Sequence, residues 1–254
     1  MKLNKIYNEN CLDTMAKMPD CFVDLTVTSP PYDNLRTYND NIDESWSDLV
    51  WKPIIKELHR VTKQGGVVVW VVGDATINGS ETGTSFKQAL WAMECGFNLH
   101  DTMIYEKNSS SYPSNSNSLR YTQIYEYMFI FSKNKPLVNL ICDKKNKWAG
   151  HKDFSGKLKK PVPDFSPRNN IWKYTTSFNG ENHPAPFPEQ LAADHIRSWS
   201  NEGDTVYDPF MGSGTTAKMA HILKRNWIGS ELSKEYVDLA NKRLDPILRQ
   251  TTLF

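Results

Sequence analysis

A hydroxyl, two prolines and an aromatic ring follow directly on a short apolar run, in the peptide Thr28-Ser29-Pro30-Pro31-Tyr32. Each proline fixes its backbone φ at about −65° and lacks an N–H donor, so this peptide is a stiff corner whose carbonyl groups are free. The hydroxyl and the carbonyls can accept hydrogen bonds from an amino group, while the ring can lie flat on a planar base. The corner therefore suits chemistry at the exocyclic amine of a nucleobase, although it also fits a strand that ends in an ordinary Pro-Pro turn.

A glycine turn near the C-terminus is the second segment that could do chemistry. It runs from the predicted strand Thr205–Asp208 through Asp208-Pro209-Phe210-Met211-Gly212-Ser213-Gly214-Thr215-Thr216 into a predicted helix. Its glycines let the backbone pass close to a ligand, and the start of a helix offers unpaired N–H groups. A Gly-x-Gly turn alone fits any dinucleotide-binding fold. Ala217 replaces the third glycine of the phosphate-binding fingerprint, and no Gly-Lys-Ser/Thr of a Walker loop follows.

A carboxylate ends the next predicted strand, which covers Asn226 to Glu231. An acidic residue at this point of a nucleotide-binding sheet can accept hydrogen bonds from both hydroxyl groups of an adenosine ribose. The spacing between the glycine turn and Glu231 therefore predicts a site for an adenosine-containing cofactor.

Together these segments resemble the DNA amino-methyltransferases that use S-adenosylmethionine. The glycine turn matches the cofactor loop of that family almost letter for letter, and Ser29-Pro30-Pro31-Tyr32 resembles its catalytic tetrapeptide. His183-Pro184-Ala185-Pro186-Phe187-Pro188 resembles the element that precedes the cofactor loop. The catalytic motif comes before the cofactor motif, as in the β group of the family. The resemblance extends from about residue 6 to residue 244.

The resemblance implies a role for each motif residue. The catalytic residues are Ser29, Pro30, Pro31 and Tyr32. The residues that bind S-adenosylmethionine are Asn10, Thr28, Phe187, Asp208, Pro209, Phe210, Gly212, Ser213, Gly214, Thr215, Thr216 and Glu231. The glycine turn wraps the methionine part, Glu231 takes the ribose, and Phe187 packs near the adenine. Asn10 stands where the family often has an aspartate, so its contact is in doubt. No metal is needed.

The implied reaction begins with a base flipped out of the duplex, because a stacked base is out of reach. The Ser29 hydroxyl and the Pro30 carbonyl each accept a hydrogen bond from the amine, which favours the positive charge that develops on nitrogen. Tyr32 stacks on the base, and in-line alignment with the methyl group supplies much of the rate. The chain contains no Pro-Cys dipeptide, so methylation at carbon 5 of cytosine is set aside.

The identity of the base follows from the family rather than from physics, because cytosine and adenine both present an amine. Serine before Pro-Pro-Tyr goes mostly with cytosine N4 in this family, and aspartate or asparagine goes mostly with adenine N6. The continuation Asp33–Tyr38 also resembles the cytosine group. We predict cytosine N4, with adenine N6 as the alternative. A DNA-binding protein without catalysis, or a methyltransferase for RNA or a protein amide, are further hypotheses.

Basic residues gather in one part of a chain that as a whole is close to neutral, with 30 Lys and Arg against 29 Asp and Glu. Residues 133–173 hold eleven basic and three acidic residues, with Trp148, His151, Phe154, Phe165 and Trp172 between them. Basic groups bind phosphates and aromatic rings can stack or wedge, so we predict an insert that faces double-stranded DNA. A solvated basic surface is the alternative. The predicted DNA contacts are Arg36, Arg120, Lys144, Lys145, Lys147, Lys159, Lys160 and Arg168.

The order of elements predicts the fold. Strands are expected at residues 25–28, 67–72, 101–106 and 124–131, with helices from about residue 45, at 86–95, and from residues 189 and 233. We expect Pro53 to kink or split its helix, and the last helix to fray or bend at Pro246. Alternating strands and helices predict an α/β fold, a doubly wound, mainly parallel, Rossmann-like sheet with the basic insert. Ligands of such sheets bind at the carboxyl ends of the strands.

The expected organisation is a catalytic half at 1–133, a target-recognition insert at 134–182 and a cofactor-binding half at 183–254. The polar stretch 108–118 is either a linker or a lid that closes on DNA. The longest apolar run, Val67–Val72, is too short to cross a bilayer, and the N-terminus lacks the apolar stretch of a signal peptide. Four scattered cysteines indicate neither disulfides nor zinc, so we expect a cytoplasmic protein. A restriction endonuclease partner and a homodimer are left open.

Overall fold

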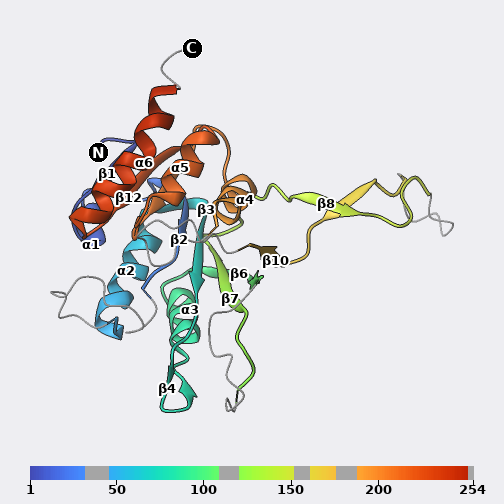
Figure 1. The fold of residues 1–254 in the computed structure, drawn as a ribbon, viewed down its shortest axis with the longest axis horizontal. Coiled ribbons are helices and arrows are strands. Elements are labelled where there is room, and N and C mark those ends of the chain that lie inside the picture. Colours follow the sequence, from blue (N-terminus) through green and yellow to red (C-terminus); the bar gives the residue numbers. More distant parts are fainter. Residues whose placement is uncertain (32–45, 109–119, 152–160, 176–187, 251–254) are drawn as a thin grey trace.

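One eight-stranded sheet forms the centre of the molecule (Figure 1). The structure is a computed structural model, and it describes residues 1–31, 46–108, 120–151, 161–175 and 188–250. Its strands in spatial order are β1 (Lys5–Tyr7), β12 (Asn226–Ser230), β11 (Thr205–Asp208), β2 (Val23–Thr28), β3 (Thr62–Val72), β7 (Tyr125–Ser132), β6 (Asn98–Lys107) and β10 (Ile171–Tyr174). The first five are mutually parallel, and β10 is parallel to β6. Only β7 runs antiparallel to both of its neighbours. The predicted mainly parallel α/β sheet is confirmed.

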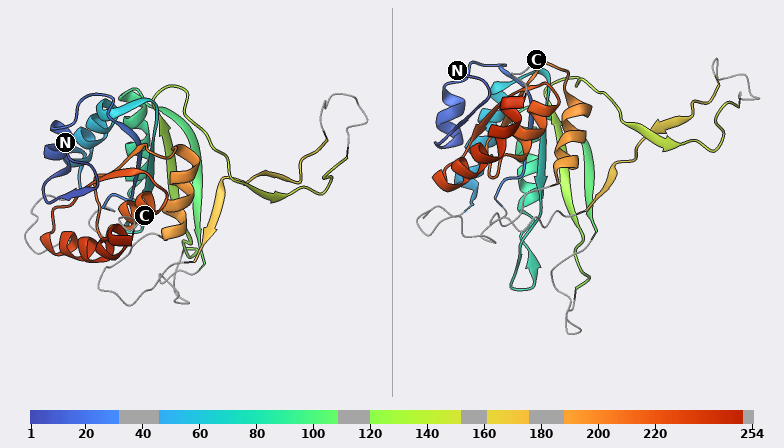
Figure 2. Two further views of the ribbon diagram at one scale, coloured as in Figure 1. Left: turned by 90° about the horizontal axis from the view of Figure 1, so that it is seen from above. Right: turned by 45° about the horizontal axis from the view of Figure 1, so that its top comes forward.

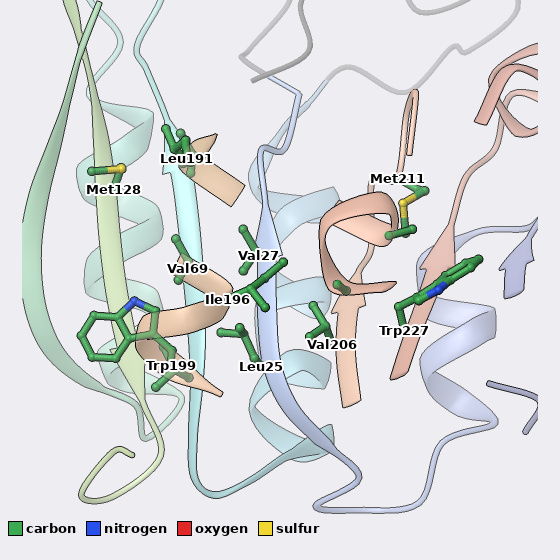
Figure 3. Packing of buried hydrophobic residues seen from close by; sticks show 14 of the residues in the cluster. Leu25, Val27, Val69, Met128, Leu191, Ile196, Trp199, Val206, Met211 and Trp227 are labelled. Carbon is green, nitrogen blue, oxygen red and sulfur yellow. The ribbon is translucent and has the colours of Figure 1, made fainter. Parts of the chain in front are cut away.

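Helices cover both faces of this sheet. They are α1 (Cys11–Ala16), α2 (Asp48–Val61), α3 (Thr84–Glu94), α4 (Glu189–Trp199), α5 (Thr215–Ile222) and α6 (Lys234–Gln250). Val69 points into one apolar layer together with Ile196 of α4, whereas Trp70 points into the opposite layer together with Trp51 of α2. Figure 3 shows Leu25, Val69 and Ile196 in the first layer. Burial on both faces explains why the run Val67–Val72 has no polar member.

The prolines inside two helices do not divide them, so the predicted split at Pro53 is wrong. Helix α2 runs through Pro53 to Val61, and α6 runs through Pro246 to Gln250. A proline removes the hydrogen bond to the carbonyl four residues earlier, which belongs to Leu49 in α2. Leu49 is exposed, so water can satisfy that carbonyl. Helix α3 ends at Glu94, one residue before the predicted end, and Gly96 follows in the left-handed region at φ 105°.

A two-stranded ribbon stands apart from the sheet. It consists of β8 (Cys142–Lys145) and β9 (Phe165–Pro167), which pair antiparallel, and Figure 2 shows it extending away from the body. A smaller hairpin of β4 (Thr76–Ile77) and β5 (Ser80–Glu81) follows β3. The basic segment of the sequence is therefore divided, because the ribbon projects whereas β10 lies in the main sheet. Trp172 of β10 is buried in the core, so it cannot stack on DNA as the sequence suggested.

None of the helices within the described residues combines the length and the apolar character that crossing a membrane requires.

The central core predicts a large difference between two leucine truncations. Leu25→Ala removes a fully buried side chain of β2, whereas Leu49→Ala removes one that is 88% exposed on α2. We expect Leu25→Ala to lower the free energy of unfolding by about 2–5 kcal/mol. The matched Leu49→Ala control should stay within about 0.5 kcal/mol of the wild type. Urea titrations followed by circular dichroism measure both values, and equal losses would contradict this assignment of the core.

Candidate active site

The proline corner and the glycine turn meet because β2 and β11 are neighbouring parallel strands. Thr26 pairs with Tyr207, so the two strands end at the same edge of the sheet. Thr28 ends β2 and Asp208 ends β11, and the Thr28 Oγ1 hydroxyl donates to Asp208 Oδ1 over 2.7 Å. Both side chains are buried. Two segments that lie 180 residues apart in the sequence are thus joined by one hydrogen bond.

The Asp208 carboxylate also organises the glycine turn. Its Oδ1 accepts a second hydrogen bond, from the backbone N–H of Phe210 over 3.0 Å. Burial raises the pKa of Asp208 to about 6, although the hydrogen bonds from Thr28 and Phe210 act in the opposite direction. Asp208 is therefore a buried acid that titrates much closer to neutrality than an ordinary aspartate.

The two glycines of the turn adopt conformations that other residues rarely take. Gly212 has φ 50° and Gly214 has φ 83°, both in the left-handed region. A Cβ on Gly214 would also lie 3.0 Å from the Cβ of Ala240 in α6. After the turn, Thr216 Oγ1 donates to the carbonyl of Val27 over 3.1 Å. This is a second hydrogen bond between the cofactor side and the strand that carries the proline corner.

Glu231 closes the same edge of the sheet from β12. Its Oε2 accepts from the N–H of Gly212 over 2.9 Å, and its Oε1 accepts from the N–H of Ser233 over 2.8 Å. Burial raises the pKa of Glu231, against these backbone donors. Each carboxylate oxygen has a further lone pair, so the group can still accept hydrogen bonds from two ligand hydroxyls. The predicted ribose-binding residue lies next to the glycine turn.

The N-terminal segment reaches this edge through Asn8 rather than Asn10. The side-chain amide of Asn8 donates to the carbonyls of Glu231 and Leu232, each over 2.9 Å. Asn10 caps α1, and its Oδ1 accepts from the N–H of Leu12 over 2.9 Å. The Asn10 side-chain oxygen, which stands where the family often has an aspartate carboxylate, thus already accepts a hydrogen bond from its own helix.

Aromatic rings surround Phe210 of the glycine turn. Its ring meets Trp46 edge to face at 5.5 Å and Trp70 at 6.2 Å between centroids. Trp70 is fully buried in β3 and its indole N–H donates to Gln88 of α3 over 2.9 Å. Phe210 of the turn is therefore packed on the sheet face that α2 and α3 cover.

The sequence analysis missed a charged cluster behind the turn. Arg243 of α6 donates through Nη1 to the Ser213 carbonyl over 3.2 Å, to Ser213 Oγ over 3.1 Å and to Thr215 Oγ1 over 3.2 Å. Its Nη2 donates to Glu189, the first residue of α4, which also accepts from Lys218 of α5 over 2.6 Å. The helical spacing of Ala240 and Arg243 was the only sequence signal, and it does not identify the partner.

The residues predicted to bind DNA are placed differently from one another. Lys144, Lys145 and Lys147 are exposed on or beside the ribbon. Arg120 lies beside the β4–β5 hairpin and pairs with Glu81 at 3.5 Å. Arg168 pairs with Asp143 and Asp194, so its guanidinium is already engaged within the protein. The remaining predicted site residues, Tyr32, Arg36, Lys159, Lys160 and Phe187, lie outside the described residues.

Comparisons with known proteins agree with this geometry. The family model described as DNA methylase, for N6 and N4 methyltransferases, matches residues 23–242. The orphan methyltransferase M.BamHII of Bacillus amyloliquefaciens is 55% identical over 249 residues, which cover 89% of each chain.

Solved structures share the fold. PvuII DNA methyltransferase, described as cytosine-N4-specific, superposes with a TM-score of 0.72 at 22% identity, over 94% of this chain and 85% of the other. The M1.HpyAVI–SAM complex superposes with a TM-score of 0.62 at 26% identity, over 94% and 99%. Helices on both sheet faces and the turn after β11 therefore belong to an architecture seen in other methyltransferases.

The raised pKa of Asp208 predicts a pH dependence of stability. Between about pH 4 and pH 6 the folded protein keeps a proton on Asp208 that the unfolded chain releases, so stability falls as pH rises through this range. One pKa unit corresponds to about 1.4 kcal/mol, so the whole fall is on the order of 3 kcal/mol. Asp208→Asn should lack this contribution. The unfolding free energy of the wild type minus that of Asp208→Asn, measured by urea titration from pH 4 to pH 7, should therefore fall as pH rises. A difference that stays constant would contradict the raised pKa of Asp208.

Proposed function

The chain belongs to the N6/N4 DNA methylase family, and within it we propose a methyltransferase that modifies cytosine N4 in double-stranded DNA with S-adenosylmethionine as donor. The observation that carries this proposal is the buried hydrogen bond between Thr28 and Asp208. It places the residue before Ser29-Pro30 in contact with the first residue of the glycine turn. The proline corner, which can accept hydrogen bonds from an amine, and the glycine turn, which fits a cofactor, thus lie at one edge of the sheet.

The proline corner would orient the amine. Ser29 is half-buried and Pro30 is buried at the end of β2, so their positions are fixed by the central sheet. The Ser29 hydroxyl and the Pro30 carbonyl each accept a hydrogen bond from one N–H group of the amine. These bonds stabilise the positive charge that develops on nitrogen. Tyr32, the residue after the corner, stacks on the flipped base. Rigid acceptors need no reorganisation during the reaction, and this is their contribution to the rate.

The glycine turn and Glu231 fit the proposed cofactor. The left-handed glycines leave the backbone bare of side chains, and the N-terminus of α5 offers N–H groups to a carboxylate. Glu231 keeps acceptor capacity for two ribose hydroxyls. S-adenosylmethionine, which is present in the M1.HpyAVI complex, carries these groups and supplies an activated methyl group. Arg243 does not reach the ligand in this proposal, but holds Ser213 and Thr215 in place.

Cytosine N4 is favoured over adenine N6 by one residue. Ser29 precedes Pro30-Pro31, as in the cytosine group of the family. The structural similarity to the cytosine-N4-specific PvuII enzyme, at 22% identity, supports the fold and leaves the base to be measured. The exposed lysines of the ribbon support duplex DNA as the substrate, because each can neutralise a phosphate.

The test of this function is a methyl-transfer assay on genomic DNA with tritiated S-adenosylmethionine, followed by mass spectrometry of the nucleosides. We expect N4-methylcytosine from the wild-type protein. Ser29→Ala should lower kcat by about 100-fold, because it removes one acceptor that acts on developing charge. The melting temperature and the affinity for the cofactor should stay unchanged. Products that contain N6-methyladenine and no N4-methylcytosine would overturn the assignment of the base. If no methylated base forms when intact S-adenosylmethionine is supplied, the proposed function is wrong.

Arg243 provides a separate test of the cofactor site. Arg243→Met removes the hydrogen bonds to Ser213 and Thr215 and should raise the Kd for S-adenosylmethionine by about tenfold, a loss of roughly 1.4 kcal/mol. Arg249→Met is the matched control, because Arg249 lies on the same helix, pairs with Asp245 and has a side chain that is 78% exposed. Isothermal titration calorimetry measures both constants. An equal Kd in the two variants would show that Arg243 does not support the turn.

A further inference from the structure

The β8–β9 ribbon leaves the body with almost no cover of its own. All four residues of β8 are exposed, as are Trp148 at 67% and Phe165 at 50%. A hairpin of two strands is marginally stable in water when neither face is covered. The direction in which the ribbon projects must therefore be set by the contacts at its base.

Helix α4 forms hydrogen bonds with both legs of the ribbon, and Figure 1 shows α4 beside the point where the leg to β8 leaves the body. On the leg that leads to β8, the backbone N–H of Asn139 donates to the carbonyl of Ser198 over 2.8 Å. The Asn139 side-chain amide donates to the carbonyls of Arg197 over 3.3 Å and of Ser200 over 3.2 Å. On the leg that returns from β9, Arg168 Nη1 donates to Asp194 Oδ2 over 2.8 Å. One helix thus anchors the outgoing leg near its C-terminus and the returning leg near its middle.

The Arg168 guanidinium joins three elements at this base. Its Nε donates to Asp143 of β8 over 2.9 Å, and its Nη1 donates to the hydroxyl of Tyr174 in β10 over 3.2 Å. The guanidinium also lies over the ring of Trp172, 5.2 Å from the centroid. With Asp194 included, a single side chain connects the ribbon, the main sheet and α4.

The carboxylate that receives this guanidinium is buried and fully bonded. The Asp194 side chain is 4% exposed. Besides Arg168, it accepts from Tyr174 Oη over 2.8 Å, from Gln190 Nε2 over 2.7 Å and from Arg197 Nη1 over 3.1 Å. Losing the Arg168 guanidinium would leave this buried carboxylate with Arg197 as its one remaining cation among the described residues, so the pair favours the geometry in which both guanidinium groups reach it. The Arg168–Asp194 pair can therefore fix an angle, which an exposed pair cannot do.

We propose that Arg168 is a positioning residue, which sets through Asp194 the direction in which the ribbon meets double-stranded DNA. The inference rests on the proposed function. A two-stranded ribbon fits the major groove of a duplex, and the exposed Lys144, Lys145 and Lys147 supply the charge that phosphates attract. The angle of the ribbon then decides which base lies opposite Ser29. Arg168 serves recognition without touching the DNA.

A phosphate contact and a positioning role differ in their dependence on salt. Losing one phosphate contact weakens binding to all duplexes and lowers the slope of log Kd against log salt by about 1. Losing a positioning residue leaves the slope unchanged and reduces the preference for the specific site over other sequences. Lys145→Met is the matched control for a phosphate contact, because Lys145 is exposed on β8.

The experiment measures Kd by fluorescence anisotropy for Arg168→Met, Asp194→Asn and Lys145→Met. The probes are a duplex with the methylated site, found by sequencing DNA modified by the wild type, and a scrambled duplex, each at several KCl concentrations. We expect Arg168→Met and Asp194→Asn to lower the ratio of the affinity for the specific duplex to that for the scrambled duplex by about tenfold. The slope of log Kd against log salt and the Kd for S-adenosylmethionine should stay at their wild-type values. Lys145→Met should instead keep the ratio and lower the slope.

Two results would overturn the inference. One is an Arg168→Met variant that behaves like Lys145→Met, and the other is an Asp194→Asn variant with the wild-type ratio. Should Arg168→Met fail to fold, Arg168→Lys keeps the charge and should still lose the ratio, because an ammonium cannot reach partners arranged for a planar fork. A wild-type protein that methylates no DNA would instead remove the proposed function. Wild-type methylation with unchanged ratios in the variants would remove only the role of Arg168.

Discussion

The hydrogen bond between Thr28 and Asp208 is the contact on which the rest of the candidate site depends. It is short, buried and made by the last residues of two neighbouring parallel strands. Parallel pairing brings the carboxyl ends of strands to one edge whatever their order in the sequence. A chain that begins with the proline corner and ends with the glycine turn can therefore assemble the same edge as a chain with the reverse order.

Helix α4 connects this edge to the ribbon. Its first residue, Glu189, pairs with Arg243 and Lys218 behind the glycine turn, while Asp194 and the carbonyl of Ser198 hold the two legs of the ribbon. The helix has only eleven residues and packs through Leu191 and Ile196 on the central sheet. Most of its residues are buried, and close packing leaves such a helix little freedom to shift. A single element thus connects the glycine turn to the ribbon that we propose meets DNA.

Sequence predicted the parts of the structure that are specified locally. The apolar run of β3, the end of α3 and the two motifs each depend on a few consecutive residues. The cluster around Arg243 could not be predicted, because Glu189 lies 54 residues away and charge alone does not select a partner. The burial of Trp172 could not be predicted either, because residues 171–174 alternate between exposed and buried in the structure, whereas the exposed Ile171 is apolar and the sequence shows no such alternation.

Two buried aspartates show how the structure separates support from chemistry. Asp194 is compensated by the guanidinium groups of Arg168 and Arg197, so its charge is bound within the protein. Asp208 receives the hydroxyl groups of Thr28 and Thr216 and a backbone N–H, with no ion pair among the described residues, and burial raises its pKa to about 6. A carboxylate without a cationic partner stabilises a positive charge that arrives with a ligand. Under the proposed function, a positively charged cofactor bound beside the turn would favour the ionised form of Asp208, and the Thr28 hydroxyl would then donate to a full carboxylate charge.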